Sequence, residues 1–174
     1  PSSDPSVEVF RGPNIGPPPA NGPMPETLSC RVAAAVGDKV TTDHIMPAGS
    51  LLKYRSNIPV YAQYAFRDVA PGFAAACRAN AAEGMASAIV AGQSYGQGSS
   101  REHAAMCPMY LGVKLVVAAS VERIHAANLV NFGILMLEFE DPGDRSAIGP
   151  GDELRVRDVR RAAASGKEIG RAHV

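Results

Sequence analysis

The sequence predicts one α/β domain, because short apolar strands and helical segments alternate along its 174 residues. The clearest strand is Ala86–Ala91, which is short, mostly apolar and bounded by Gly84 and Gly92. A hydrophobic content of 46% is enough for a buried core and argues against a disordered chain. Together these observations favour a globular domain built around a sheet.

Residues 1–29 are predicted to be a Pro/Gly-rich linker that precedes the domain. Prolines fix the backbone and remove amide donors, so the segment from Pro13 to Pro23 suits an extended, semi-rigid tether. The domain itself is expected over residues 30–160. Residues 161–174 lack a pattern, and we interpret them as a truncated tail of a domain excised from a longer chain.

The first half of the domain contains one predicted strand, one loop and two helices. Pro59 suits the first turn of a helix, for which Ser56 or Asn57 is the expected N-terminal cap. A second helix is predicted from an alanine-rich segment. In chain order, the predicted elements are a strand at 31–36, a loop at 43–55, a helix from Pro59 to Phe66 and a helix at 73–80.

The second half continues the alternation of strands and helices. Gly133 is expected to end a helix at its C-terminus. The last strand alternates polar and apolar residues and is therefore predicted to be half-exposed. The predicted elements are a helix at 121–131 and strands at 86–91, 114–119, 134–139 and 153–157.

A glycine-rich turn after a buried strand is the main candidate site. Residues 94–105, SYGQGSSREHAA, combine glycines, two hydroxyls and an arginine. Ser99 or Ser100 can cap a helix through Arg101, and Glu102 completes a capping box with Ser99. Backbone amides at such a helix start, together with Arg101, predict an anion site. The alternative is an ordinary turn with a surface ion pair, and the turn fits neither the P-loop nor the dinucleotide fingerprint.

Composition and charge disfavour several kinds of partner. The chain has 17 basic and 17 acidic residues and no long run of like charge, which argues against nucleic acid and anionic membranes. No apolar run could span a membrane and no signal peptide is recognisable, so a cytoplasmic protein is the default. Widely spaced Cys30, Cys77 and Cys107 predict reduced thiols and no metal site. The alternative is that His103 and Cys107, four residues apart on one predicted helix, share a metal, but a lone pair of this kind is usually packing.

Three motifs carry a family resemblance. Residues 94–105, together with 41–49 (TTDHIMPAG) and 53–55 (KYR), resemble the C-terminal swivel domain of aconitase, the iron-sulfur enzyme that interconverts citrate and isocitrate. The chain resembles the separate small subunit of 3-isopropylmalate isomerase less closely. The similarity extends over residues 7–159 and implies a three-layer β/β/α swivelling domain, which periodicity alone does not predict.

The resemblance implies roles for five residues. Ser99 corresponds to the base that removes a carbon-bound proton as an alkoxide. Asp43 corresponds to an active-site carboxylate, and we expect it to orient a donor or an arginine near Ser99. Arg55, Ser100 and Arg101 correspond to contacts with substrate carboxylates. The alternative for Asp43, which Pro47 and Gly49 follow, is a simple turn residue. Without the resemblance, Arg55 would be interpreted as a solvated surface charge.

The resemblance also implies a cofactor that this chain does not hold. Aconitases bind a [4Fe-4S] cluster through cysteines of another domain, and its iron polarises the hydroxyl group that leaves. The expected partners are therefore N-terminal cluster-binding aconitase domains, in the same polypeptide or in a large subunit, and a tricarboxylic acid substrate. The chain alone would then be one part of a hydro-lyase, an aconitate hydratase.

Other functions stay open at this point. A small subunit of 3-isopropylmalate isomerase or of homoaconitase matches the chain length. Arg55 favours a tricarboxylate instead, and Gln97 stands where those small subunits often carry Cys. A different class of function is a non-catalytic carboxylate-binding module or an RNA-regulatory module, the latter disfavoured by zero net charge.

Overall fold

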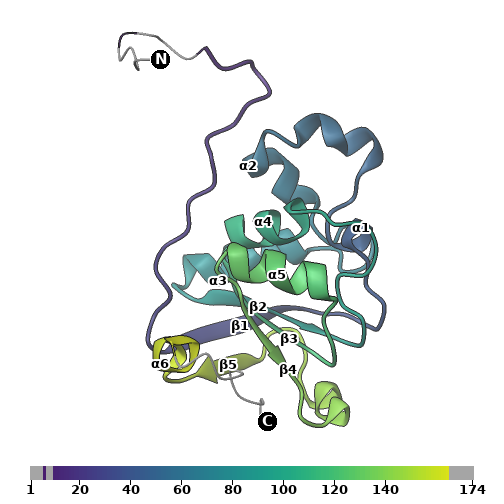
Figure 1. The fold of residues 1–174 in the computed structure, drawn as a ribbon, viewed down its shortest axis with the longest axis vertical. Coiled ribbons are helices and arrows are strands. Elements are labelled where there is room, and N and C mark those ends of the chain that lie inside the picture. Colours follow the sequence, from purple (N-terminus) through teal and green to yellow (C-terminus); the bar gives the residue numbers. More distant parts are fainter. Residues whose placement is uncertain (1–5, 7–9, 165–174) are drawn as a thin grey trace.

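The computed structural model describes residue 6 and residues 10–164, with side chains described up to residue 161. The described residues form one five-stranded sheet in the order β4-β3-β2-β1-β5 (Figure 1). The first four strands are parallel to their neighbours, and β5 is antiparallel to β1. The strands are β1 (Leu28–Ala35), β2 (Ala86–Ala91), β3 (Val113–Ala118), β4 (Leu135–Glu138) and β5 (Glu153–Val156).

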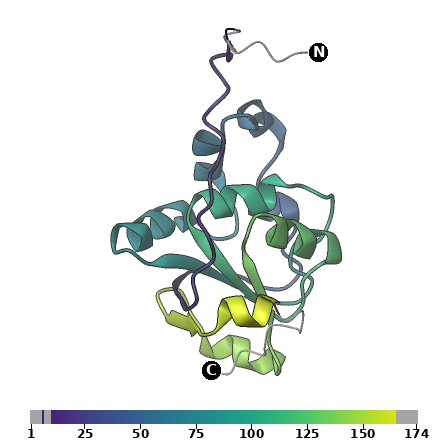
Figure 2. The same cartoon turned by 60° about the vertical axis from the view of Figure 1, so that its left-hand side comes forward.

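Helices cover both faces of this sheet (Figures 1 and 2). One face carries α1 (Thr42–Ile45), α2 (Ile58–Tyr61), α3 (Phe73–Ala82), α4 (His103–Tyr110) and α5 (Arg123–Asn131). The opposite face carries α6 (Val159–Ala164) and the 3-10 helix η3 (Pro142–Ala147). Two further 3-10 helices, η1 (Gly49–Tyr54) and η2 (Ala62–Tyr64), flank α2.

The central strands are buried on both faces, which explains their nearly continuous apolar sequences. Ile89 and Val116 pack into the core beneath the helices. Val90 and Val117, which point the other way, pack with Val159 of α6. Because each central strand contributes to both cores, the strands that carry the functional loops are held from both sides.

All five strands lie within a residue or two of where the sequence predicts them, except that β1 begins earlier, at Leu28. The predicted helix from Pro59 to Phe66 is wrong beyond Tyr61. The chain continues as η2, and Phe66 adopts a positive φ of 56° while its amide donates to the Ile45 carbonyl. Tertiary burial of Phe66 therefore overrides the local preference for a helix.

Two further segments contain more helix than the sequence predicts. The predicted loop at 43–55 contains most of α1 and all of η1, so it is more ordered than expected. The predicted tail at 161–174 begins inside α6, and its residues 165–174 lie outside the described part of the chain.

The N-terminal segment runs along the surface of the domain without forming a helix or strand at residues 10–27 (Figure 1). Several backbone contacts attach it. The Gly16 amide donates to the Ser56 carbonyl over 3.0 Å, and the Asn21 side-chain amide donates to the Phe132 carbonyl over 2.8 Å. Nearer the sheet, the Val159 amide donates to the Glu26 carbonyl. The role of a tether stays a prediction, but these contacts tie the segment to the domain at three places.

Limited proteolysis with trypsin is expected to cut after Arg11 before it cuts after Arg101. Arg11 is exposed and follows Phe10, which is 93% exposed, whereas the Arg101 side chain is 27% exposed and ion-paired. Mass spectrometry of the early fragments checks this order. Arg67, an exposed arginine within the domain, is the internal comparison. A first cut after Arg101 would contradict the structure of the glycine-rich loop.

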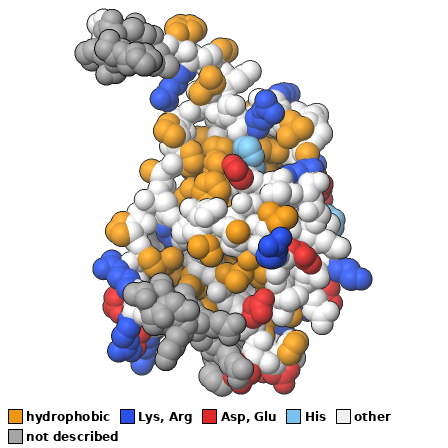
Figure 3. Space-filling model, viewed as in Figure 1, with side chains coloured by type: hydrophobic (Ala, Val, Ile, Leu, Met, Phe, Trp, Pro, Cys, Tyr) orange, Lys and Arg blue, Asp and Glu red, His pale blue; other side chains and the backbone are white. Residues whose placement is uncertain are grey.

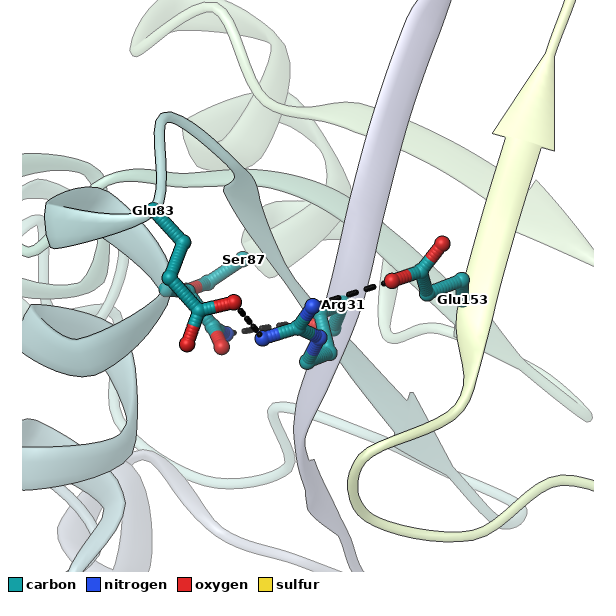
Figure 4. A network of polar contacts seen from close by, with 5 residues as sticks. Arg31, Glu83, Ser87 and Glu153 are labelled. Carbon is teal, nitrogen blue, oxygen red and sulfur yellow. Dashed lines mark hydrogen bonds and ion pairs between the residues drawn. The ribbon is translucent and has the colours of Figure 1, made fainter.

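Arg31 links three elements at the edge of the sheet (Figure 4). From β1, its guanidinium contacts Glu83, which follows α3, at 2.6 Å and Glu153 of β5 at 2.9 Å. Both hydrogen bonds raise the pKa of Arg31 further above its usual range, and the bond to Glu83 is the larger cause. Both carboxylates are well exposed, so solvent screens each pair and weakens it. The network therefore helps to orient β5 rather than carrying the stability of the fold.

Candidate active site

The loops that follow three parallel strands meet at one edge of the sheet. The chain after β1 carries Asp43 and Arg55, the chain after β2 carries residues 94–102, and the chain after β3 leads into α5. Isolated bridges join Thr41 to Gln97 and Tyr95 to Val121, so the three segments lie side by side. The carboxyl edge of a parallel sheet is where α/β proteins usually bind their ligands.

Gly96 allows the β2 loop to lie directly against α5. Its φ is +82°, and an added Cβ would lie 2.2 Å from Cδ2 of His125. The Gly96 amide also donates to the Val40 carbonyl over 2.8 Å, which holds the loop to the segment after β1. Only glycine satisfies both the backbone conformation and this close approach.

Ser99 lies in a pocket of about 210 Å³ between the β2 loop and the start of α5, here called the Ser99 pocket. The Thr42 hydroxyl donates to the Ser99 carbonyl over 2.9 Å and so holds the loop against α1. The residues that line the Ser99 pocket are Thr42, Gly96, Gly98, Ser99, Ser100, Arg101, Glu122, Arg123, Ile124, His125 and Asn128.

Arg55 lines a neighbouring hollow of about 380 Å³, here called the Arg55 pocket. Ser100 and Arg101 line both pockets and form the wall between them. The structure therefore brings Arg55, Ser100 and Arg101 together in one pocket and Ser99, Ser100 and Arg101 in the other. The remaining residues of the Arg55 pocket are Ala48, Leu52, Tyr61, Glu102 and His103.

Asp43 lies beside the shared wall, where its carboxylate forms an ion pair with the Arg101 guanidinium. The short helix α1 positions it: Thr41 is the N-cap, and its hydroxyl accepts from the amide of His44. In return, Nδ1 of His44 accepts from the Thr41 amide, which completes a capping box. Asp43 thus contacts an arginine of the candidate site, and its orienting role stays a prediction.

His103 holds the Arg55 end of the site. Its Nε2 donates to the Arg55 carbonyl over 2.9 Å, and its ring packs edge-on against Tyr61 at 5.5 Å between centroids. The Tyr61 hydroxyl in turn donates to the Pro47 carbonyl over 2.9 Å. Burial, the largest cause, raises the pKa of Tyr61 above its usual value. The first turn of α4 is therefore joined to the backbone that carries Arg55.

The predicted capping of a helix by Ser99 or Ser100 is wrong. α4 begins at His103 with Glu102 at its N-cap, and no side chain caps it. The amide of Ala104 donates to the Arg101 carbonyl, so a turn already satisfies part of the helix start. The helix whose start does line the Ser99 pocket is α5.

Sequence reasoning missed the α5 wall, which contributes Arg123, His125 and Asn128. His125 is 2% exposed, and its ring packs edge-on against Tyr95 at 5.2 Å between centroids. Burial lowers the pKa of His125 to about 4. The signal that could have found this wall is the strand at 114–119: if it lies parallel and next to 86–91, the segment after it must reach the same edge.

The cysteines of this chain do not suit an iron-sulfur cluster. Cys30, Cys77 and Cys107 lie on β1, α3 and α4 respectively, and all three are fully buried free thiols. Burial raises their pKa values to about 12, 11 and 12, so all three are protonated thiols near neutral pH. Among the described residues, no group of three or more His, Cys, Asp or Glu could hold a metal ion.

Two features bear on possible partners: the lengths of the described helices and the distribution of basic side chains. None of the helices in the described part of the chain is long and apolar enough to cross a bilayer. On the face drawn in Figure 3, basic side chains are scattered among acidic and neutral ones rather than gathered into a continuous band.

Comparisons with known proteins match the chain to one family. The model of the aconitase C-terminal domain matches residues 52–142. A probable mitochondrial aconitate hydratase of Caenorhabditis elegans is 33% identical over 144 residues, covering 72% of this chain and 18% of that protein. Small subunit 2 of 3-isopropylmalate dehydratase from Archaeoglobus fulgidus is 39% identical over 120 residues, covering 69% of this chain and 66% of that subunit.

A solved structure agrees with these sequence matches. The crystal structure of 3-isopropylmalate dehydratase from Methanocaldococcus jannaschii superposes with a TM-score of 0.58 and 28% identity, covering 78% of this chain and 73% of that one. The chain spans about a fifth of the length of the aconitate hydratases that it matches, between 17% and 24% in the examples compared.

Proposed function

The chain belongs to the aconitase C-terminal domain family, and on that premise we propose that it supplies the base and the carboxylate contacts of an aconitate hydratase. Such an enzyme interconverts citrate and isocitrate by dehydration and rehydration. The observation that carries the proposal is the wall of Ser100 and Arg101, which separates the pocket of Ser99 from the pocket of Arg55.

The two arginines suit a substrate with several carboxylates. Arg55 and Arg101 line the same pocket, and each guanidinium offers a planar pair of donors that matches a carboxylate. Asp43 orients Arg101 through their ion pair, and His103 holds the Arg55 backbone. The substrate would thus be anchored beside Ser99 through its carboxylates while its reacting carbons lie toward the Ser99 pocket.

Ser99 acts as the base in this proposal. Its alkoxide accepts a proton from a substrate carbon, the C–H electron pair forms the double bond, and the hydroxyl on the neighbouring carbon leaves. In water an alkoxide is strongly disfavoured, so nearby donors and positive charge must stabilise it. Arg101 and the start of α5, which line the Ser99 pocket, are placed to do this.

The [4Fe-4S] cluster of the proposed enzyme lies outside this chain. The three cysteines are buried, protonated and carried by separate elements, so we assign the cluster to N-terminal aconitase domains on the same polypeptide or on a large subunit. When bound there, the cluster supplies a Lewis acid for the departing hydroxyl. A cytoplasmic location stays a prediction, because several of the matching hydratases are named as mitochondrial.

A second candidate is the small subunit of a 3-isopropylmalate dehydratase or of a homoaconitase. The observation that favours it is the coverage of 66% of the Archaeoglobus fulgidus subunit, against about a fifth of the hydratases. The two candidates differ in substrate. Turnover of citrate by the assembled enzyme supports the first, whereas turnover of 3-isopropylmalate alone supports the second.

Arg55→Lys is expected to raise KM for citrate by roughly tenfold to a hundredfold and to change kcat by less than about threefold. Lysine keeps the charge but loses the bidentate carboxylate contact. Steady-state kinetics of the assembled enzyme measure both constants. Arg67→Lys is the matched control, because Arg67 is exposed, pairs with Asp68 and lines neither pocket. An unchanged KM for Arg55→Lys would remove Arg55 from the substrate contacts.

A further inference from the structure

Buried polar groups without partners gather behind the Ser99 pocket. Among the described residues, neither ring nitrogen of His125 has a hydrogen-bond partner, and the same holds for the Asn128 side-chain nitrogen and the Tyr95 hydroxyl. Leaving such a group unpaired costs free energy, because it loses its hydrogen bonds to water on folding and gains none. Native proteins rarely contain several such groups together, so we expect a bound molecule or water to form hydrogen bonds with them.

The cluster borders the pocket, although its unpaired atoms are shielded from solvent. His125 and Asn128 both line the Ser99 pocket. They are three residues apart on α5, so their side chains lie on one face of that helix. Gly96 packs directly against the His125 ring, and any larger residue at position 96 would collide with it. A bound molecule would therefore pair with these nitrogens only after a small turn of the two side chains into the pocket.

The start of α5 adds donors to the same wall. The first bond within this helix is from the Ala126 amide to the Glu122 carbonyl, so the amides of residues 123–125 have no acceptor within the helix. No side chain caps this end. Such a helix start carries partial positive charge and favours an anion.

The charges around the pocket agree with an anionic occupant. Arg101 and Arg123 line it, against a single acid, Glu122. Arg101 shares its charge with Asp43, whereas Arg123 is exposed and belongs to α5 itself. The donors of the α5 wall outnumber its acceptors, which suits a carboxylate better than a cation or a neutral sugar.

We propose that Arg123, His125, Asn128 and the first-turn amides of α5 form a carboxylate subsite of the Ser99 pocket, distinct from the Arg55 pocket. It takes one carboxylate of a di- or tricarboxylic acid whose other carboxylate reaches Arg55. The identity of that acid as substrate rests on the proposed function, but the subsite itself does not. Because Ser99 lies in the same pocket, the subsite would fix the end of the ligand next to the base.

Nuclear magnetic resonance of the isotope-labelled 174-residue chain tests the subsite with tricarballylate, a tricarboxylate that lacks the hydroxyl needed for dehydration. Saturable shifts of the Asn128 side-chain amide are expected, with a dissociation constant on the order of 1 mM. The same titration should raise the pKa of His125 from its starting value of about 4, because a nearby anion favours the imidazolium form. A role in packing alone would leave that pKa unchanged.

Asn128→Asp is the decisive variant, since it replaces the donor with a like-charged carboxylate and should weaken binding more than tenfold. Asn131→Asp is the matched control, because Asn131 is exposed on the same helix and lines neither pocket. Asn128→Ala, expected to weaken binding about tenfold, replaces the first variant if the buried carboxylate unfolds the chain. Thermal unfolding of each variant identifies that case.

Two outcomes overturn the subsite. If tricarballylate shifts the side chains of Arg55 and Arg101 but not those of Asn128 and His125, the subsite is wrong while the proposed function stands. If Asn128→Asp and Asn131→Asp bind alike, α5 contributes nothing and an ordered water is the better occupant of the wall. If α5 responds but citrate is not turned over by the assembled enzyme, the proposed function fails and the subsite stands.

Discussion

Ser99→Ala is expected to lower kcat of the assembled enzyme by roughly a thousandfold, while KM changes by less than about threefold. The hydroxyl acts only when the proton leaves the substrate carbon, so its loss affects the transition state more than the bound substrate. The change removes a single exposed oxygen from the Ser99 pocket and leaves the carbonyl that accepts from Thr42 in place. Stability should therefore be almost unaffected, and steady-state kinetics of the two proteins give the ratio.

Ser100→Ala is the matched control for that measurement. Ser100 neighbours Ser99 but lines both pockets, and its expected contact is with a carboxylate. Its loss should therefore raise KM and leave most of kcat. Similar, small effects of both substitutions would contradict the assignment of the base.

Gly96→Ala is expected to destabilise the fold by about 3–5 kcal/mol or to prevent folding. Two costs combine at this position: a φ of +82° that disfavours any side chain, and a Cβ placed 2.2 Å from the His125 ring. Urea unfolding followed by circular dichroism measures the change in the free energy of unfolding.

Gly84→Ala separates the two costs. Gly84 has a similar φ of +73°, but an added Cβ would meet nothing within 4 Å. Its substitution should cost only about 1–2 kcal/mol, the penalty of the left-handed backbone. Equal losses for the two variants would mean that the packing of Gly96 against α5 contributes nothing.

Regular elements are predictable here because local sequence and tertiary environment agree. The run Ala86–Ala91 is apolar on both faces, and both faces are buried in the sheet. Phe66 shows the opposite case: helical preference extends to it, but its side chain is drawn into the core and its backbone leaves the helix. Such a conflict depends on distant residues, and no local pattern encodes it.

The α/β class is confirmed by the sheet and its helices, and the swivelling domain implied by the family resemblance is confirmed by the likeness to the dehydratase structure. The resemblance to the aconitase C-terminal domain is confirmed by the family match. The roles of Ser99, Asp43, Arg55, Ser100 and Arg101 stay predictions. Their grouping around one wall is a feature of the structure that the motifs alone do not reveal.

The α5 wall was not predictable from the motifs, because its residues are spread across a turn and a helix. Arg123, His125 and Asn128 have no signature spacing, and a lone histidine on a helix is usually a core residue. Their proposed role depends on β3 lying beside β2, since this pairing brings the start of α5 next to Ser99. The order of strands in the sheet is therefore needed to predict that the start of α5 lies near Ser99.

The most direct test of the account is a complementation assay. The chain, a separately produced cluster-binding aconitase region and a mixture of the two are each supplied with citrate, and formation of aconitate is followed by its ultraviolet absorbance. The account predicts no turnover by the chain alone, turnover by the mixture, and loss of that turnover when the chain carries Ser99→Ala. Turnover of citrate by the chain alone, or full turnover by the mixture with Ser99→Ala, would contradict it.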